Sequence, residues 1–357
     1  MDTKKIASAF HFGSPILSVD ECLSGHVNNT FFVNCKDAHF VVQKINTVAF
    51  KKPAEIMSNI VRVTDHIRQK LQEAGGDVIN GVLQFFKSGE NYFYVDDKGD
   101  YWRACRLVDG DCLDTCDSPS IFSKAGKAFG EFGRQLSDFD ATSLYEPIAD
   151  FHNTAKRYEA LEEAIATDVC GRVKECLPEI EFIRKRKQDC SFIVDRLADG
   201  TFPTHVTHGD TKLNNVILNK HTGEGLCVID LDTVMAGSLL YDFGDAVRYG
   251  ASSAAEDEAD LSKVYLRTDM FEAFTEGFLE GLGNSVTKAE LLAFPEGARI
   301  LTLEVAIRFL TDYLLGDVYF RTSSEKHNLV RARNQIKLVL DIEEKYSTLQ
   351  EIVKKYL

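Results

Sequence analysis

The feature that most constrains this 357-residue chain is a change of hydrophobic pattern near residue 110. Before it, one helix is predicted from Pro53, because apolar residues between Ile56 and Leu71 recur at three- and four-residue steps. After it helices dominate, beginning with Ser118 as N-cap and Pro119 as first helical residue. Short runs rich in Val, Phe and Tyr predict antiparallel strands at 30–33, 39–44, 81–86, 92–96 and 101–108. The pattern favours an α+β fold with a small antiparallel sheet, one main helix and a larger, mainly helical part.

Length and composition limit the class of protein further. A chain this long exceeds the usual size of one hydrophobic core, so we expect two lobes, 1–107 and 108–357, with a hinge at about 107–110. The net charge of −14 argues against nucleic acid as a partner. No run of eighteen apolar residues predicts a membrane span, and nine scattered cysteines without a CxxC pair suggest reduced thiols. A cytoplasmic protein is expected, and no feature predicts a protein partner.

The polar residues that carry chemistry are concentrated between Val206 and Leu231. A strand end, the loop HGDTKLNN, a hairpin turning at 221–223 and the apolar run CVIDLD follow one another. Phosphoryl transfer requires a carboxylate for the attacking hydroxyl and oxygen ligands for Mg²⁺. Asp210 fits the base, while Asn215 and Asp230 fit the metal ligands. The spacing therefore predicts a kinase of small molecules.

This segment resembles the aminoglycoside phosphotransferase and choline kinase superfamily, whose bilobal fold is similar to protein kinases. The segments HGDTKLNNVILN, VIDLDTVMAGSLLYDFGDAVRYGAS, RFLTDYLLGDVYF and HNLVRARNQIKLV look more specifically like N-acetylhexosamine 1-kinases. That resemblance implies transfer of phosphate from ATP, with Mg²⁺, to the anomeric hydroxyl of N-acetylglucosamine or N-acetylgalactosamine. The first lobe would then bind the nucleotide, and the second would carry the catalytic and sugar-binding residues.

The nucleotide side is less strongly marked. The stretch SGHVNNTFFV places Gly25, His26 and Asn28 where a hairpin would cover phosphates, although it is not a Walker A sequence. A strand lysine normally meets the phosphates, but the kinase pattern aligns Gln43 there, with Lys44 next to it. Adjacent strand residues face opposite sides, so both cannot point into one cleft without a bulge. Which of the two meets the nucleotide stays open.

Two residues are expected to support the catalytic loop. Asp242 opens a DFG tripeptide like that of protein kinases, but it lies within a predicted helix, so the metal aspartate is placed at Asp230. The superfamily resemblance instead gives Asp242 a bracing role, with hydrogen bonds to the loop. Asp245 could equally face solvent. His208 is expected to be a structural hydrogen-bonding residue rather than a proton shuttle.

The sugar side is predicted in the apolar segment LTLEVAIRFLTDYLLGDVYF. Glu304, Arg308 and Asp312 lie at four-residue steps on an otherwise apolar helix, which predicts a polar cavity or buried network. The resemblance to hexosamine kinases supports Arg308 and Tyr319 as sugar contacts. Two further residues of the matching motifs are Tyr249 and Asp317.

Three alternatives remain. The first is a kinase of the same superfamily acting on choline, homoserine or an aminoglycoside, but a cationic substrate would be repelled by Arg308. The second is a pseudokinase that binds nucleotide without turnover. The third, a metal-dependent hydrolase built around His208, lacks the clustered histidines that a catalytic zinc needs.

Overall fold

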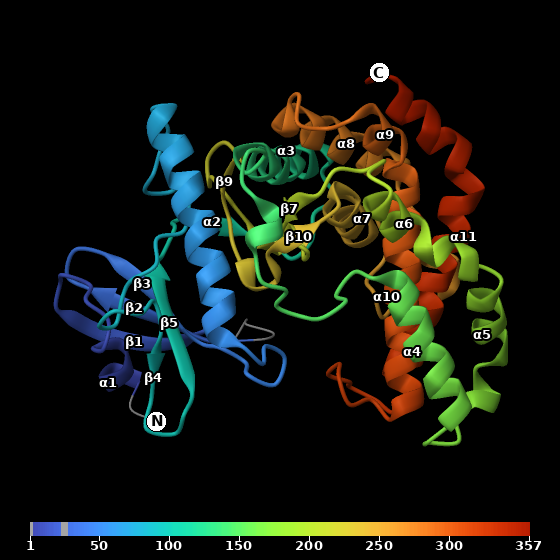
Figure 1. Cartoon of the computed structure of the whole chain (residues 1–357), viewed down its shortest axis with the longest axis horizontal. Coiled ribbons are helices and arrows are strands. Elements are labelled where there is room, and N and C mark those ends of the chain that lie inside the picture. The colour runs from blue at the N-terminus through green and yellow to red at the C-terminus, as the bar shows by residue number, and fades with distance from the viewer. Residues whose placement is uncertain (1–2, 23–27) are drawn as a thin grey trace.

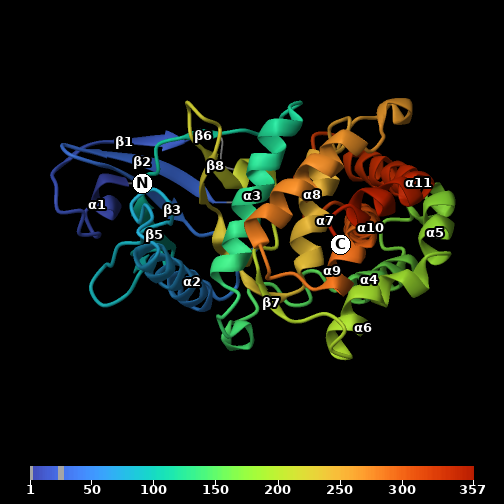
Figure 2. The same cartoon turned by 90° about the horizontal axis from the view of Figure 1, so that it is seen from above.

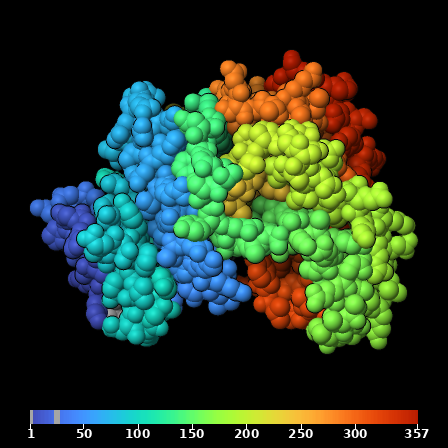
Figure 3. Space-filling model, viewed as in Figure 1, coloured from blue at the N-terminus to red at the C-terminus, as the bar shows by residue number. Residues whose placement is uncertain are grey.

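The computed structural model describes residues 3–22 and 28–357 of the chain. The five-stranded sheet, the short helix α1 and the long helix α2 form one half of the molecule, and helices α3 to α11 form the other half (Figures 1 and 2). No helix within the described residues is long and apolar enough to cross a membrane. The space-filling view shows this face indented between the blue segment that leads into α2 and the orange-red segment that follows α10 (Figure 3).

The N-terminal sheet is antiparallel, with strand order β1-β2-β3-β5-β4. One face packs around Trp102 and the short helix α1, and the other faces α2. Its strands are β1 (Ile16–Cys22), β2 (Asn29–Cys35), β3 (His39–Lys44), β4 (Tyr94–Val95) and β5 (Tyr101–Arg106); α1 is Thr3–Ala7. The sequence analysis missed β1, which alternates weakly because most of its side chains are exposed.

The strand predicted at 81–86 is wrong. Its backbone joins β5 only at the isolated bridge between Phe85 and Cys105. The next part of the β5 edge is occupied by β4, where Tyr94 pairs with Trp102. The strand predicted at 92–96 is correspondingly shortened to two residues, because β5 offers one edge that these two segments share.

The helix predicted from Pro53 is confirmed as α2 (Pro53–Glu73), with its apolar stripe buried. Asn59 lies in its middle and is completely buried. Its amide donates to the carbonyl oxygens of Tyr145 and Val234, at 2.8 and 3.0 Å. These bonds connect α2 to two segments of the C-terminal half, so the helix links the sheet to the rest of the molecule.

Helices make up most of the C-terminal half. Ser118 caps α3 by accepting a hydrogen bond from the Ile121 amide, as predicted. A β-carbon on Gly277 of α8 would lie 1.8 Å from the carbonyl oxygen of Ser123, so only glycine permits α3 and α8 to pack this closely. The helices are α3 (Pro119–Gln135), α4 (Thr154–Thr167), α5 (Leu177–Arg184), α6 (Phe192–Ala198), α7 (Leu239–Gly250), α8 (Thr268–Leu282), α9 (Lys288–Leu292), α10 (Phe294–Leu315) and α11 (His327–Lys354).

Two small sheets carry the polar motif between the halves. β7 (His205–Thr207) pairs with β10 (Met235–Gly237), and β6 (Asp111–Cys112) pairs with β8 (Val216–Leu218), which pairs with β9 (Gly225–Val228). The predicted hairpin is confirmed as β8 and β9. Since β9 ends at Val228, Asp230 stands beyond the strand rather than within it.

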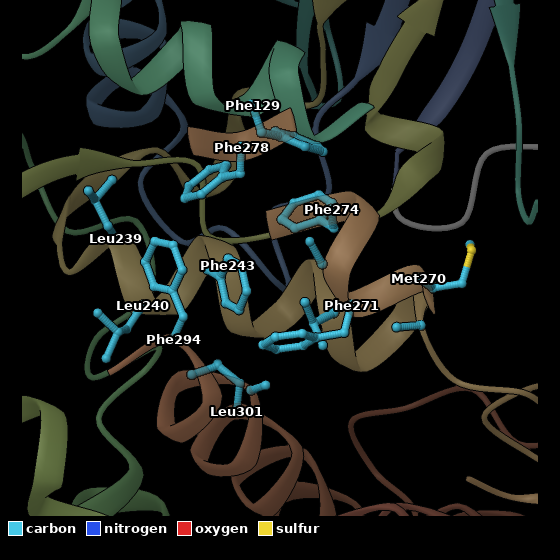
Figure 4. Packing of buried hydrophobic residues seen from close by; sticks show 14 of the residues in the cluster. Phe129, Leu239, Leu240, Phe243, Met270, Phe271, Phe274, Phe278, Phe294 and Leu301 are labelled. Carbon is cyan, nitrogen blue, oxygen red and sulfur yellow. The ribbon is translucent and has the colours of Figure 1, made fainter. Parts of the chain in front are cut away.

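The helix that follows this motif is anchored by aromatic rings. Phe243 of α7 is completely buried, and its ring stacks on Phe294 with centroids 4.1 Å apart (Figure 4). Phe271, Phe274 and Phe278 of α8 surround it. Such well-packed rings have few alternative positions. The core therefore fixes α7, and with it the neighbouring Asp242.

Candidate active site

The loop after β7 is held by Asp242 at the start of α7. The two carboxylate oxygens of Asp242 accept hydrogen bonds from the backbone amides of His208 and Gly209, at 2.9 and 2.8 Å. Thr211 donates its hydroxyl to the carbonyl oxygen of Asp242 at 2.5 Å. Gly209 has a φ of +79°, a backbone conformation that residues with a β-carbon rarely adopt. These contacts fix the backbone on both sides of Asp210.

Burial raises the pKa of Asp242, although His208 and the two backbone amides favour its charged form. The tripeptide Asp242, Phe243 and Gly244 lies inside α7, away from the end of β9. Asp242 thus contacts the loop backbone, where the bracing role predicted for it would act.

His208 links the loop to the strand end that precedes Asp230. Its Nε2 lies 2.8 Å from the carbonyl oxygen of Ile229, and its Nδ1 accepts the Asp210 amide at 3.2 Å. The ring proton therefore sits on Nε2, where it can donate to the carbonyl. Both nitrogens are occupied by backbone groups, which matches a structural hydrogen-bonding residue.

Asp210 and Asn215 come together at the ends of this loop. The Asn215 amide nitrogen donates to the backbone oxygen of Asp210 at 2.7 Å and to its Oδ2 at 3.2 Å. This leaves the amide oxygen of Asn215 without a partner among the described residues. The side chain of Asp210 is 27% exposed, so its carboxylate can meet a bound molecule.

Asp230 stands at the turn after β9 in the left-handed region, with φ of 60°. Burial, together with the carboxylates of Asp232 and Asp210, raises the pKa of Asp230 to about 6. Its carboxylate has no hydrogen bond or ion pair with any described residue. Repelling carboxylates beside an unpaired amide oxygen form a site that a cation would stabilise.

The donor set suits Mg²⁺ rather than a transition metal. Within the described part of the chain, no cluster of three His, Cys, Asp or Glu side chains is arranged to hold a metal. Mg²⁺ takes oxygen ligands and is commonly held by one or two protein groups, with water and substrate phosphates completing its shell. The Asp230 carboxylate and the Asn215 amide oxygen fit that requirement.

Lys212 is a functional candidate that the sequence analysis missed. Its Nζ lies 2.8 Å from Oδ1 of Asp210, on the oxygen not used by Asn215. Burial is outweighed by Asp210 and Asp245, so the pKa of Lys212 is raised and the side chain is cationic. Its position two residues after Asp210 in HGDTKLNN was a signal that could have identified it.

Asp245 is buried, not exposed to solvent. It accepts hydrogen bonds from Arg248 at 2.8 and 3.1 Å and from the Thr211 amide at 3.1 Å. An unpaired carboxylate could not be buried here without a large desolvation cost, and Arg248 supplies the opposite charge. α7 thus contributes a second carboxylate that holds the loop.

The structure decides how the two neighbouring β3 residues point. Gln43 accepts a hydrogen bond from Nε of Arg103 on β5 at 2.9 Å, on the sheet face that meets Asp232. Lys44 points to the opposite face and pairs with Asp100 at 2.6 Å. Gln43 therefore faces Asp232 and the predicted metal ligand Asp230, whereas Lys44 does not.

Of the three other residues predicted to bind the nucleotide, Asn28 is the one that the structure describes. Gly25 and His26 lie outside the described residues. The Asn28 amide donates to Asp232 at 2.7 Å, and its oxygen accepts the backbone amide of Asn46 at 2.9 Å. Asn28 is buried, and both ends of its amide are occupied by these contacts, which hold it beside Asp232.

A buried ion pair near the predicted phosphate position was also missed. Both terminal nitrogens of Arg103 bond the two carboxylate oxygens of Asp232, one of them at 3.1 Å. Each side chain is only 4% exposed. The sequence carried no signal for this pair, because its members are 129 residues apart. It supplies the cation on the sheet face where a lysine was expected.

The predicted sugar residues lie in two places. Arg308 and Tyr319 are near Phe320, and Tyr249 is near Lys212. The guanidinium of Arg308 lies over the rings of Phe151 and Phe320, at 5.1 and 5.6 Å from their centroids. It forms no hydrogen bond or ion pair with the residues that the structure describes. Tyr319, next to Phe320, is 58% exposed. Tyr249 is partly buried and lies near Lys212.

Asp312 and Asp317 hold the segment that follows α10. The Asp312 carboxylate accepts the backbone amides of residues 318, 319 and 320, at 2.8 to 3.0 Å. Asp317 pairs with Arg172 at 2.7 Å and accepts the Asn328 amide at 2.8 Å. Both aspartates are therefore occupied, and Arg308 is the member of the predicted stripe whose polar end is available.

Solved structures share this architecture over nearly its whole length. The aminoglycoside phosphotransferase of Alicyclobacillus acidocaldarius has a TM-score of 0.64 at 11% identity, covering 99% of this chain and 96% of its own. A spectinomycin phosphotransferase solved with ADP and spectinomycin has 0.57 at 13%, covering 98% of both chains. The choline kinase of Cryptosporidium parvum has 0.56 at 14%, covering 94% of this chain and 91% of its own.

These likenesses define a protein-kinase-like α+β fold, which confirms the predicted fold class. Residues 19–276 match the phosphotransferase enzyme family, APH. The chain belongs to this family, and it is a kinase-like phosphotransferase.

Proposed function

We propose that this phosphotransferase transfers the γ-phosphoryl group of ATP to the anomeric hydroxyl of an N-acetylhexosamine. The observation that carries the proposal is the juxtaposition of Asp210 with Asn215, with an unpaired Asp230 carboxylate nearby. These are the oxygen groups that phosphoryl transfer from a metal-bound nucleotide requires. A non-catalytic binding module would have no need for three such groups in one place.

Each group has a distinct role in the proposed reaction. Asp210 orients the acceptor hydroxyl and takes its proton, and Asn215 keeps this carboxylate in place through its amide. Lys212 lies against the other oxygen of Asp210 and can approach the transferred phosphoryl group. Mg²⁺ held by Asn215 and Asp230 would supply charge neutralisation at the phosphates. The chain's own contribution is mainly positioning and electrostatic stabilisation.

The acceptor side favours a neutral sugar over a cationic substrate. Arg308 lies over two phenylalanine rings and forms no hydrogen bond or ion pair with a carboxylate among the described residues. Arg157 lies near it, since burial and then Arg308 lower the pKa of Arg157. A quaternary amine or an aminoglycoside would be repelled there, whereas a sugar can stack on aromatic rings and accept hydrogen bonds from a guanidinium. The resemblance of the motifs to N-acetylhexosamine 1-kinases supports the same acceptor.

The proposal is tested by incubating the purified protein with Mg·ATP and separate acceptors: N-acetylhexosamines, hexoses, choline, homoserine and an aminoglycoside. ADP release and phosphorus NMR of the product identify the acceptor and the position of the phosphate. A hexosamine 1-phosphate is the expected product. Turnover with another alcohol only would contradict the sugar assignment, and nucleotide binding without any turnover would support a pseudokinase instead. The Asp210→Asn variant controls for contaminating kinases.

A further inference from the structure

A buried histidine outside the predicted motifs connects the sugar side of the molecule to the catalytic loop. His152 lies just before α4 and is 8% exposed. Its Nδ1 is 2.9 Å from Oε1 of Glu304 on α10, and its Nε2 is 2.8 Å from the carbonyl oxygen of Gly209. Both ring nitrogens thus face groups that can only accept hydrogen bonds once Glu304 is ionised.

The geometry points to His152 as a positioning residue that, in its doubly protonated form, holds the Gly209 carbonyl and through it the orientation of Asp210. A neutral imidazole has one donor and one acceptor nitrogen, so it would leave one of these two oxygens facing a lone pair. The imidazolium donates to both. This assignment rests on the proposed function, in which Asp210 meets the acceptor hydroxyl.

The Gly209 peptide is fixed from two directions as a result. Its amide donates to Asp242 on one side, and its carbonyl oxygen accepts from His152 on the other. Gly209 has a positive φ and no β-carbon, so the peptide planes on both sides of it have great freedom to rotate in the absence of these bonds. Because Asp210 follows directly, a rotation of this peptide would move its carboxylate.

The surroundings of His152 favour its charged form. Glu304 is completely buried and also accepts the Thr154 hydroxyl at 2.7 Å. Burial, which alone would favour the neutral ring, is outweighed by Glu304 and by the bond to Gly209, so the pKa of His152 is raised. Burial would raise the pKa of Glu304, but the attraction of His152 outweighs burial, so the pKa of Glu304 is lowered. Both pKa shifts favour the charged forms, so His152 and Glu304 form an ion pair.

Charged groups on the elements packed around the pair also favour its ionised form. From α7, Asp242 and Asp245 act on His152 and favour the imidazolium. The ring of Tyr241, also on α7, stacks on His152 with centroids 5.1 Å apart. The cations facing Glu304 are Arg308, one turn along α10, and Arg157 of α4. They stabilise the Glu304 carboxylate.

The connection reaches the sugar side through α10. Glu304 is four residues before Arg308, so the two lie on one face of the helix. His152 is adjacent to Phe151, whose ring lies under the Arg308 guanidinium. The chain from Arg308 through α10 and His152 to Gly209 consists of direct contacts, and it sets the acceptor pocket against Asp210.

The test uses full-length protein and two variants with a matched control. His152→Gln keeps a donor of similar size but removes the charge, and Glu304→Gln keeps the ring but removes its counter-ion. His205→Gln is the control, because His205 also contacts a completely buried glutamate, Glu290, at 2.8 Å, but makes no contact with Gly209.

The charge is measured by nitrogen-15 NMR of the imidazoles against pH, with His152→Gln identifying the signal. His152 is expected to keep both protons at pH values where an ordinary histidine has lost one, and Glu304→Gln should move its titration to lower pH. A ring that titrates in the ordinary histidine range would overturn the assignment. This measurement needs no substrate, so it stays decisive if the proposed acceptor is wrong.

The positioning role is measured by kinetics and by hydrogen exchange. His152→Gln should lower kcat about 10- to 100-fold while the KM for ATP stays within about twofold, and it should remove the decline of kcat on the alkaline side of the wild-type profile. Amides of residues 208–215 should exchange faster in this variant than in His205→Gln. Equal amide exchange in His152→Gln and His205→Gln would overturn the positioning role of His152. A His152→Gln variant with the kcat and pH profile of the wild type would also overturn it. If the wild type phosphorylates no acceptor, the proposed function fails and the exchange measurement alone decides.

Discussion

Arg103 of β5 and Asp232, two residues beyond Asp230, form a doubly hydrogen-bonded ion pair that is almost completely buried. The pair joins the N-terminal sheet to the turn that carries the predicted metal ligand. Gln43, which occupies the strand position of the expected lysine, bonds the same guanidinium. The charge on this face of the sheet therefore comes from β5 rather than from β3.

Breaking this pair should destabilise the protein strongly. Arg103→Met leaves the Asp232 carboxylate buried without its cation, and Asp232→Asn leaves the guanidinium without its anion. We expect each single variant to lose about 3–5 kcal/mol of unfolding free energy, measured by urea denaturation. The double variant should lose less than the sum. Arg103→Lys is expected to recover only part, because an ammonium cannot form the bidentate contact; single variants of wild-type stability would contradict the pair.

Replacing the neighbouring carboxylate should have the opposite effect on stability. The pKa of Asp230 is raised to about 6, so the stability linked to its protonation is present below the ordinary aspartate range and is lost as pH rises through 6. Asp230→Asn should therefore stabilise the metal-free protein by about 1–2 kcal/mol at pH 8 and by nothing at pH 4, while it abolishes Mg²⁺-dependent turnover. Thermal unfolding with EDTA across this pH range measures the effect. A destabilised variant at pH 8 would mean that Asp230 has an attractive partner.

Asp210→Asn should abolish the chemistry without removing the nucleotide. The amide cannot accept the acceptor proton, and loss of a positioned base lowers rates by about 10²–10⁴-fold. ATP affinity, measured by calorimetry with Mg²⁺, should remain within about threefold of wild type. Lys212→Met serves as a companion variant, because it removes the cation beside Asp210 and leaves the carboxylate. Activity in Asp210→Asn near that of wild type would exclude Asp210 as base.

Arg308→Ala should act on the acceptor alone. The guanidinium forms no hydrogen bond or ion pair with the described residues and lies over two aromatic rings, so its removal should raise the acceptor KM or lower kcat and leave the KM for ATP unchanged. Arg196→Ala is a matched control, because Arg196 also lies over two phenylalanine rings, Phe192 and Phe202, but on α6. Unaltered acceptor kinetics in Arg308→Ala would dismiss this pocket.

Asp242→Asn should loosen the loop that carries Asp210. The carboxylate accepts two backbone amides, and an amide side chain would place its own NH₂ group against one of them. An unsatisfied buried donor costs about 1–3 kcal/mol. We expect lower thermal stability and faster amide exchange at residues 208–211, with Mg²⁺ affinity changed less than in Asp230→Asn. Equal losses of Mg²⁺ affinity in the two variants would show that Asp242 acts on the metal.

The tertiary structure differs most from the sequence-based prediction where charged residues far apart in the sequence come into contact. Hydrophobic periodicity located α2 and the hairpin of β8 and β9, because burial of one face imposes a regular repeat. It missed β1 and wrongly extended the segment at 81–86, because the sharing of one sheet edge is not encoded locally. It also gave no sign that Asp245 is buried against Arg248.

The sequence by itself determined the fold class and brought Asp210, Asn215 and Asp230 into one short motif, because their spacing along a loop and a hairpin limits how far apart they can lie. Only the tertiary structure showed that Gln43 rather than Lys44 faces these residues and that Arg103 supplies the nearby cation. Only it placed His152 between Glu304 and Gly209. Local patterns depend on neighbours in the chain, whereas the partner of a buried charge is set by which distant elements the core packs together.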